Sequence, residues 1–195
     1  MLYAVGLGPG DKGLLTMKAV EVIKRADEVI VPGKMAYELV EDIREPRIVE
    51  FPMGNADKVV RSLAEEIAFK SSDVAFCCLG DPMFYSTFHH LYKELLRINP
   101  GIEVEIIPGI TSISCALAKA RVFVEKSLLV TTPDFAETEV VVVMKSKKPK
   151  EIAEKLREMG FADFWFVERM FMQGERITSD LPETADYFSI VVAKR

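Results

Sequence analysis

The sequence has few of the residues that build disulfide scaffolds, metal sites and histidine-based catalysis. Only three of its 195 residues are cysteine and two are histidine. Cys77 and Cys78 are adjacent in an apolar run, so a strand there would point them to opposite faces as small core residues. No cysteine–histidine grouping has the spacing of a zinc site, and we expect no bound metal. His89 and His90 are adjacent in a predicted helix, where neighbouring positions do not face one another. The sequence therefore indicates no nucleophile–base arrangement.

Long apolar runs and an excess of basic residues are also missing. No run approaches the ~20 residues that span a bilayer, and the first residues lack the basic and apolar segments of a signal peptide. Lys and Arg number 25 against 30 Asp and Glu, a net charge of −5. We therefore expect no nucleic-acid or membrane partner and a cytoplasmic location. The one sharp charge run, residues 145–150, favours a solvated loop over an anion site.

Segments of strand and helix type alternate through the first half of the chain. The predicted strands are residues 2–5, 28–31, 47–51, 73–79 and 102–106. The predicted helices are residues 14–26, 34–43, 56–69, 87–97 and 111–120, with apolar residues at helical spacing. This alternation predicts an α/β fold with a mainly parallel sheet and flanking helices.

After Arg121 the pattern becomes richer in strands. The predicted strands are residues 127–131, 140–144, 164–167 and 188–193, and residues 150–159 form one predicted helix. We therefore expect two α/β domains, residues 1–112 and residues 113–195, the second with a strand-rich mixed sheet.

Three loops follow strands and precede helices, at the sheet edge where parallel α/β proteins bind ligands. They are residues 6–11, 80–87 and 107–114. Glycine permits positive φ and close approach of a ligand, but Pro9 lacks an N–H, and neither the P-loop nor the dinucleotide spacing is present. Each loop alone also fits a structural turn, and Asp81 alone fits a helix cap. Because the strand ends reach one edge, the three loops together predict one small-molecule site.

In this order the motifs resemble the tetrapyrrole (corrin/porphyrin) methyltransferases of cobalamin and sirohaem biosynthesis. The segments that carry the resemblance are Val5-Gly6-Leu7-Gly8-Pro9-Gly10-Asp11, Leu14-Leu15-Thr16, Ala26-Asp27-Glu28-Val29, Gly80-Asp81-Pro82, Pro108-Gly109-Ile110-Thr111-Ser112 and residues 140–145. The resemblance implies a homodimer of two-domain chains, with S-adenosylmethionine (SAM) in the cleft between the domains. The SAM contacts that it implies are Pro9, Leu79, Gly80, Asp81, Phe84, Thr111 and Ser112, with Met144 and Met170 in the second domain.

Within this family, residues 80–87 are most similar to the enzymes that methylate C20 of precorrin-2 or of its cobalt form. The implied reaction is methyl transfer from SAM to C20 of a reduced tetrapyrrole in cobalamin biosynthesis. It requires positioning and exclusion of water rather than a protein nucleophile. We expect the catalytic residues Tyr85, Ser86 and Thr87 near the donor–acceptor junction. The candidate partners of the tetrapyrrole carboxylates are Lys12, Lys34, Lys145 and Arg169.

Other functions fit the same residues. The acceptor could be another corrin ring position or the diphthamide precursor, as in diphthine synthase. A module that binds an adenosine ligand without catalysis would use the same strand ends, and the glycine turns could also be purely structural.

Overall fold

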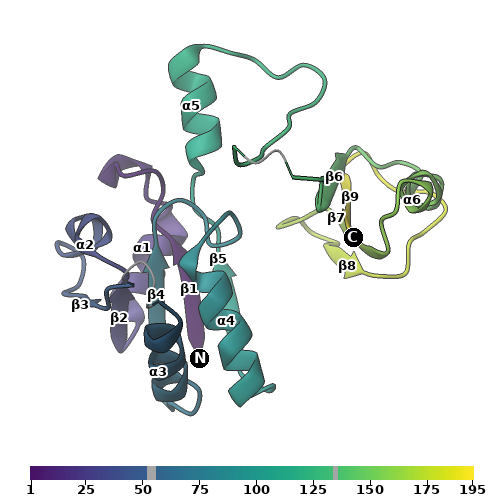
Figure 1. Cartoon of the computed structure of the whole chain (residues 1–195). Helices are drawn as coiled ribbons and strands as arrows, with labels where there is room; N and C mark the ends of the chain where they lie inside the picture. Colours follow the sequence, from purple (N-terminus) through teal and green to yellow (C-terminus); the bar gives the residue numbers. More distant parts are fainter. Residues whose placement is uncertain (52–55, 134–135) are drawn as a thin grey trace. The chain divides into compact units, whose positions relative to one another are not determined.

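The computed structural model describes residues 1–51, 56–133 and 136–195 (Figure 1). Within these ranges the chain forms two compact units, Met1–Leu128 and Leu129–Arg195. The domain boundary predicted after residue 112 falls at the start of α5 (Ser112–Ala120), which lies inside the first unit. Each unit is described by itself below.

The first unit contains a parallel sheet of five strands in the order β3-β2-β4-β1-β5. The strands are β1 (Leu2–Gly6), β2 (Glu28–Val31), β3 (Arg47–Ile48), β4 (Val74–Cys78) and β5 (Val104–Ile107). Every residue of β1 and β4 is buried, as is typical of central strands covered on both faces. Because β1 lies between β4 and β5, the loops after these three strands leave the sheet side by side.

Helices cover both faces of this sheet, and each face has its own core (Figure 1). The helices α1 (Met17–Arg25) and α2 (Lys34–Val40) pack on the face that carries Val5 and Cys77. The helices α3 (Ala56–Ile67) and α4 (Thr87–Ile98) pack on the face that carries Phe76 and Cys78. Adjacent cysteines in opposite cores confirm the predicted strand. The α/β architecture with flanking helices is also confirmed.

The second unit has a sheet of four strands in the order β6-β9-β7-β8. The strands are β6 (Val140–Met144), β7 (Asp163–Glu168), β8 (Arg176–Thr178) and β9 (Ser189–Lys194), and α6 (Pro149–Glu158) packs against their buried residues. The second sheet is rich in strands as expected, but its pairs are antiparallel rather than mixed. β9 inserts between β6 and β7, so these two strands run in the same direction without pairing.

Local differences from the prediction have simple causes. Residues 127–131 form no strand, and Leu128, Leu129 and Val130 are exposed without a pairing partner. The sequence missed β8, which is three residues long and pairs with the end of β7. It also missed the short 3-10 helix Lys12–Leu14, and α1 begins at Met17 rather than at the predicted Leu14.

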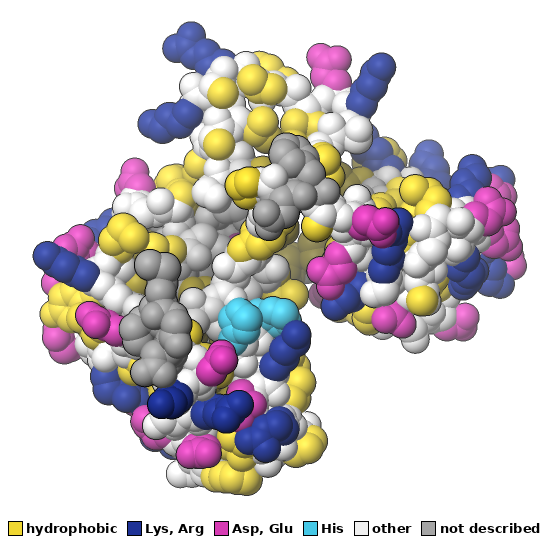
Figure 2. Space-filling model, viewed as in Figure 1, with side chains coloured by type: hydrophobic (Ala, Val, Ile, Leu, Met, Phe, Trp, Pro, Cys, Tyr) yellow, Lys and Arg dark blue, Asp and Glu magenta, His cyan; other side chains and the backbone are white. Residues whose placement is uncertain are grey.

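The segment from α5 onward leaves apolar side chains exposed. α5 has no buried residue, and the exposed fractions after it are 55% for Val122, 88% for Phe123 and 46% for Val124. Figure 2 shows hydrophobic side chains among those at the surface in this region. Among the residues that the structure describes, no helix has the length and apolarity needed to span a bilayer.

Candidate functional site

The loops after β4, β1 and β5 meet at the carboxyl edge of the first sheet. The Leu7 N–H donates to the Cys78 carbonyl at 2.9 Å, which extends the ladder between β1 and β4 by one residue. Gly8 and Gly80 then exchange two backbone hydrogen bonds of 3.1 and 2.7 Å. Both of these glycines have positive φ, at 73° and 69°, where other residues are strained. The first two loops are therefore joined through their backbones.

Glycine is required where the third loop approaches the first two. A Cβ added to Gly109 would lie 2.1 Å from the Gly80 carbonyl oxygen and 2.9 Å from the Gly6 Cα. A Cβ added to Gly6 would lie 2.5 Å from the Gly109 nitrogen. These distances leave no room for a side chain, so the three loops pack backbone against backbone. We call Gly6, Gly80 and Gly109 the glycine contact.

Asp81 ties the second loop to the third. It is 7% exposed, and its Oδ2 accepts a hydrogen bond of 3.0 Å from the Gly109 N–H. Its Oδ1 accepts one of 2.8 Å from Met83 N–H within its own loop. None of the ion pairs formed by the described residues includes Asp81. A buried carboxylate with two amide donors and no ion-pair partner therefore lies beside the glycine contact.

The run Tyr85-Ser86-Thr87 divides into different local roles. Ser86, rather than Asp81, is the N-cap of α4, because its Oγ accepts from Phe88 N–H at 3.1 Å. Thr87 is the first residue of the helix and is half-buried. Tyr85 has a positive φ of 49° and its side chain is 73% exposed. The side chain of its neighbour Phe84 is also exposed, at 49%. Helix capping explains the presence of Ser86. No contact among the described residues explains the strained backbone or the exposed ring of Tyr85.

The remaining predicted residues of the first unit lie at the same edge. Thr111 is the N-cap of α5, and its Oγ1 accepts from Ser114 N–H at 3.4 Å. Ser112 follows it and is exposed. Pro9 is half-buried in the first loop, and Leu79 packs in part against the core formed with α1 and α2. The structure therefore brings the predicted donor contacts and catalytic residues of the first unit to the ends of three adjacent strands.

In the second unit, Met144 and Met170 lie at one edge of its sheet. Met144 ends β6 and is 70% exposed, and Met170 follows β7 and is 47% exposed. Met144 pairs with Ile190 and the end of β7 pairs with Ser189, so this edge also contains the start of β9.

The four cations predicted as carboxylate partners differ in what they already bind. Lys12 forms an ion pair with Asp42, and Lys34 approaches Glu38 at 3.7 Å. Arg169 binds Asp186 at 2.6 Å, and this ion pair raises the pKa of Arg169. Lys145 has no ion pair among the described residues and instead lies 5.2 Å from the ring centroid of Tyr187. Tyr187 was not identified from the sequence, because no motif surrounds it.

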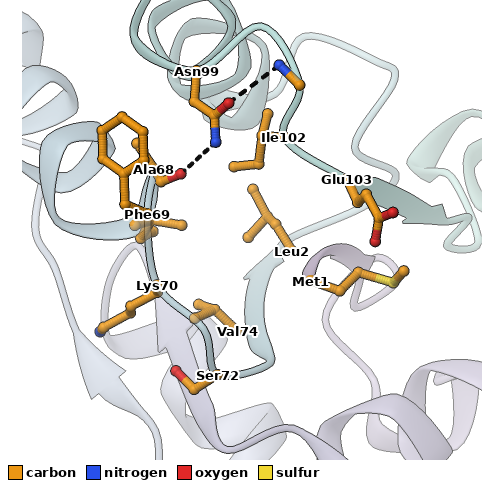
Figure 3. A pocket seen from close by; sticks show the side chains of 12 residues that line it. Met1, Leu2, Ala68, Phe69, Lys70, Ser72, Val74, Asn99, Ile102 and Glu103 are labelled. Carbon is orange, nitrogen blue, oxygen red and sulfur yellow. Dashed lines mark hydrogen bonds between the residues drawn. The ribbon is translucent and has the colours of Figure 1, made fainter.

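A concave region lies away from these loops (Figure 3). This pocket of about 300 Å³ is lined by residues at the amino ends of β1 and β4, such as Leu2 and Val74. Asn99 borders it, donating to the Ala68 carbonyl at 2.7 Å and accepting from Gly101 N–H at 3.2 Å. No residue predicted from the sequence lines it. Since open α/β sheets bind ligands at the carboxyl ends of their strands, we place the candidate site at the glycine contact.

The chemistry available at this edge is positioning rather than nucleophilic attack. Burial raises the pKa of the Cys78 thiol to about 11 and also raises that of Cys77, so both remain protonated at neutral pH. His89 and His90 are exposed on α4, with their ring centroids 5.6 Å apart. Among the described residues, no group of three or more His, Cys, Asp or Glu side chains could hold a metal ion.

Comparison with known sequences gives matches over the whole chain. The model of the family described as tetrapyrrole (corrin/porphyrin) methylases matches residues 1–185. The probable cobalt-precorrin-2 C(20)-methyltransferase of Methanocaldococcus jannaschii is 31% identical over 222 aligned positions, covering 100% of this chain and 96% of that protein. The precorrin-2 C(20)-methyltransferase of a Sinorhizobium species is 32% identical over 233 positions, covering 98% and 94%.

A solved structure supports the fold. The uroporphyrin-III C-methyl transferase of Thermus thermophilus, crystallised in complex with S-adenyl homocysteine, is 24% identical. It aligns with a TM-score of 0.52 over 99% of this chain and 96% of its own.

The glycine contact predicts the effect of one added methyl group. We expect Gly109→Ala to lower the free energy of unfolding by about 3 kcal/mol, because the Cβ overlaps the Gly80 carbonyl and must separate the loops. Gly101→Ala is the matched control, since its Cβ would meet only the Asn99 side chain at 3.7 Å, and its effect should stay within about 0.5 kcal/mol. Urea unfolding followed by circular dichroism measures both, and equal midpoints would contradict the packing described.

Proposed function

The chain belongs to the tetrapyrrole (corrin/porphyrin) methylase family, and we propose that it transfers a methyl group from SAM to C20 of a reduced tetrapyrrole in cobalamin biosynthesis. The acceptor would be precorrin-2 or cobalt-factor II. The observation that carries the proposal is the similarity over nearly the full length of both chains to two proteins named as C20-methyltransferases. One of them is named for the cobalt form of the substrate and the other for precorrin-2, so the two acceptors are treated as one class.

The residues at the carboxyl edge fit SAM as the donor. When bound, SAM supplies a methyl group on a positively charged sulfonium. Asp81 supplies a buried negative charge that has no ion-pair partner among the described residues and that a cationic ligand would neutralise. A Cβ on Gly10 or Gly80 would meet no atom of the described residues within 4 Å, so the backbone there is open to a ligand. The exposed Phe84 ring adds an apolar surface beside these polar groups.

Positioning is the contribution that we assign to the remaining residues. We infer that Pro9, Leu79, Gly80, Thr111 and Ser112 hold the donor through the three loops. The exposed Tyr85 ring and the hydroxyls of Ser86 and Thr87 would border the donor–acceptor junction and keep water from it. Met144 and Met170 are proposed as the donor contacts of the second unit. The strain at Tyr85 supports a functional role, because strained residues concentrate at ligand sites.

We further propose that the protein is a cytoplasmic homodimer. The exposed apolar segment that includes Val122, Phe123 and Val124 supports association, since contiguous exposed apolar surface marks interaction sites. Cys77, Cys78 and Cys115 are all free, which fits a reducing compartment. Recovery with a cytoplasmic marker enzyme on cell fractionation tests the location.

The position of the transferred methyl group tests the proposed reaction. We expect incubation with cobalt-factor II or precorrin-2 and SAM labelled with ¹³C at its methyl group to give one new methyl signal, at C20, together with S-adenosylhomocysteine. NMR of the product locates the carbon. A methyl group at another ring position would assign the chain to a different step, and methylation of the diphthamide precursor would replace the tetrapyrrole altogether. Binding of SAM without any methylated product would indicate a non-catalytic module.

The role of Asp81 can be separated from its structural hydrogen bonds by using two ligands. We expect Asp81→Asn to weaken SAM binding by about 10- to 100-fold, because an unpaired positive charge then remains at the site. S-adenosylhomocysteine lacks the sulfonium charge, so its affinity should fall much less. Both affinities are measured by calorimetric titration, with the exposed Asp57→Asn as the control. An equal loss for the two ligands would assign Asp81 to loop structure alone.

The oligomeric state gives a further measurement. Light scattering coupled to size exclusion should give twice the 21.9 kDa of one chain. Phe123→Asp should shift this mass toward the monomer, because it places a charge in the exposed apolar segment. A monomeric wild-type protein would refute the dimer without affecting the proposed reaction.

A further inference from the structure

Two lysines and a tyrosine lie together at the edge of the second sheet where β6 ends and β9 begins. The Lys145 Nζ lies 5.2 Å from the ring centroid of Tyr187, and the Lys147 Nζ lies 5.9 Å from it. Phe188 stands edge-to-face against Tyr187 with ring centroids 5.4 Å apart. Both rings are exposed, at 47% for Tyr187 and 56% for Phe188. The surface thus combines two ammonium groups with two aromatic rings.

The turn that carries the lysines is fixed by its own hydrogen bonds. Ser146 is fully buried between them, its N–H donating to the Ser189 carbonyl at 3.0 Å and its Oγ donating to the Val143 carbonyl at 2.8 Å. The Ala185 N–H donates to the Lys147 carbonyl at 2.9 Å. The backbones on either side of Tyr187 are thereby joined to the lysine turn, so the groups are held together in advance of any ligand.

The Tyr187 side of the surface is anchored separately. Asp186 binds the Arg169 guanidinium at 2.6 Å and its own N–H donates to Glu168 at 2.7 Å. The Arg169 N–H donates to the Phe188 carbonyl at 2.8 Å. Arg169 therefore positions the aromatic pair through these bonds. Lys145 and Lys147 are the cations of this edge that form no ion pair with a described residue.

Neither lysine has an acidic partner among the residues that the structure describes. The next lysines in the sequence do have acidic partners, since Lys148 binds Glu151 at 2.7 Å and Lys150 binds Glu183 at 2.6 Å. A hydrogen bond with Tyr187 raises the pKa of Lys145, so its ammonium stays charged at neutral pH. In a chain with a net charge of −5, two unpaired cations on an aromatic pair form a local site for an anion.

We propose that Lys145, Lys147 and Tyr187 form the subsite that binds the peripheral carboxylates of the tetrapyrrole acceptor. The ammonium groups make charge-assisted hydrogen bonds to two carboxylates, and the exposed rings contact the flat conjugated body of the macrocycle. A simple phosphate would use the cations but not the rings, so the combination favours a planar polycarboxylate. This inference rests on the proposed function for the identity of the acceptor.

Uroporphyrin III, a stable planar polycarboxylate, serves as the binding probe. We expect Lys145→Gln combined with Lys147→Gln to weaken its binding by about tenfold, as two exposed ion pairs are lost. The matched control is Lys24→Gln combined with Lys155→Gln, which makes the same change in net charge at two other exposed lysines. Replacing Lys145 and Lys147 by arginine should restore binding, and Tyr187→Leu should weaken it with both charges kept. Fluorescence titration gives these affinities.

Methyl transfer provides the second measurement. With the tetrapyrrole acceptor, the glutamine pair should raise the KM for the acceptor about tenfold and leave the SAM dissociation constant unchanged. Affinity and KM equal to those of the Lys24/Lys155 control would overturn the subsite while leaving the proposed reaction intact. A wild-type chain that methylates no tetrapyrrole but binds uroporphyrin III through Lys145 and Lys147 would overturn the reaction and keep the subsite. Melting temperatures equal to the control's exclude misfolding as the cause of weaker binding.

Discussion

The packing of three loop backbones against one another is the constraint on which the first unit's candidate site depends. Gly6, Gly80 and Gly109 approach so closely that a single Cβ at Gly6 or Gly109 would separate the loops. Asp81 reinforces the contact, because one carboxylate bridges the N–H groups of two loops. The starts of α4 and α5, capped by Ser86 and Thr111, follow directly from these loops. Each residue that we assign to the donor in this unit is therefore positioned by the same small set of backbone contacts.

Much of the fold could be predicted because burial leaves a recognisable pattern of apolar residues in the sequence. The strands β1 and β4 are continuous apolar runs, β2 is apolar after Glu28, and the helices of the first unit show apolar residues at helical spacing. The same signal was wrong for residues 127–131, where Leu128, Leu129 and Val130 are apolar but pair with no strand in the described part of the chain. β8 was missed because it has only three residues, too few to show a sequence pattern, and it is a strand because it pairs with β7. The prediction of a mixed second sheet was wrong because β9 inserts between β6 and β7, and this pairing is set by tertiary packing rather than by local sequence.

The candidate site could be predicted to the level of loops but not of contacts. Glycine-rich segments after three strands indicated a shared edge, and the sheet order brings them together. The sequence could not distinguish a ligand-binding Asp81 from a capping one, since its bond to Gly109 joins residues 28 apart. The charge run at residues 145–150 was interpreted as a solvated loop. That interpretation fits Lys148 and Lys150, which pair with glutamates, but Lys145 and Lys147 lie against Tyr187 instead.

The two edges described carry opposite charges, and this difference can sort the two ligands of the proposed reaction. The first edge offers backbone groups and the buried carboxylate of Asp81, which attracts a sulfonium and repels an anion. The second offers the ammonium groups of Lys145 and Lys147, which attract the acceptor's carboxylates, beside the uncharged side chains of Met144 and Met170 that we propose as donor contacts. A methyl transfer that needs no protein nucleophile depends on such sorting, because its rate enhancement comes from placing donor and acceptor correctly.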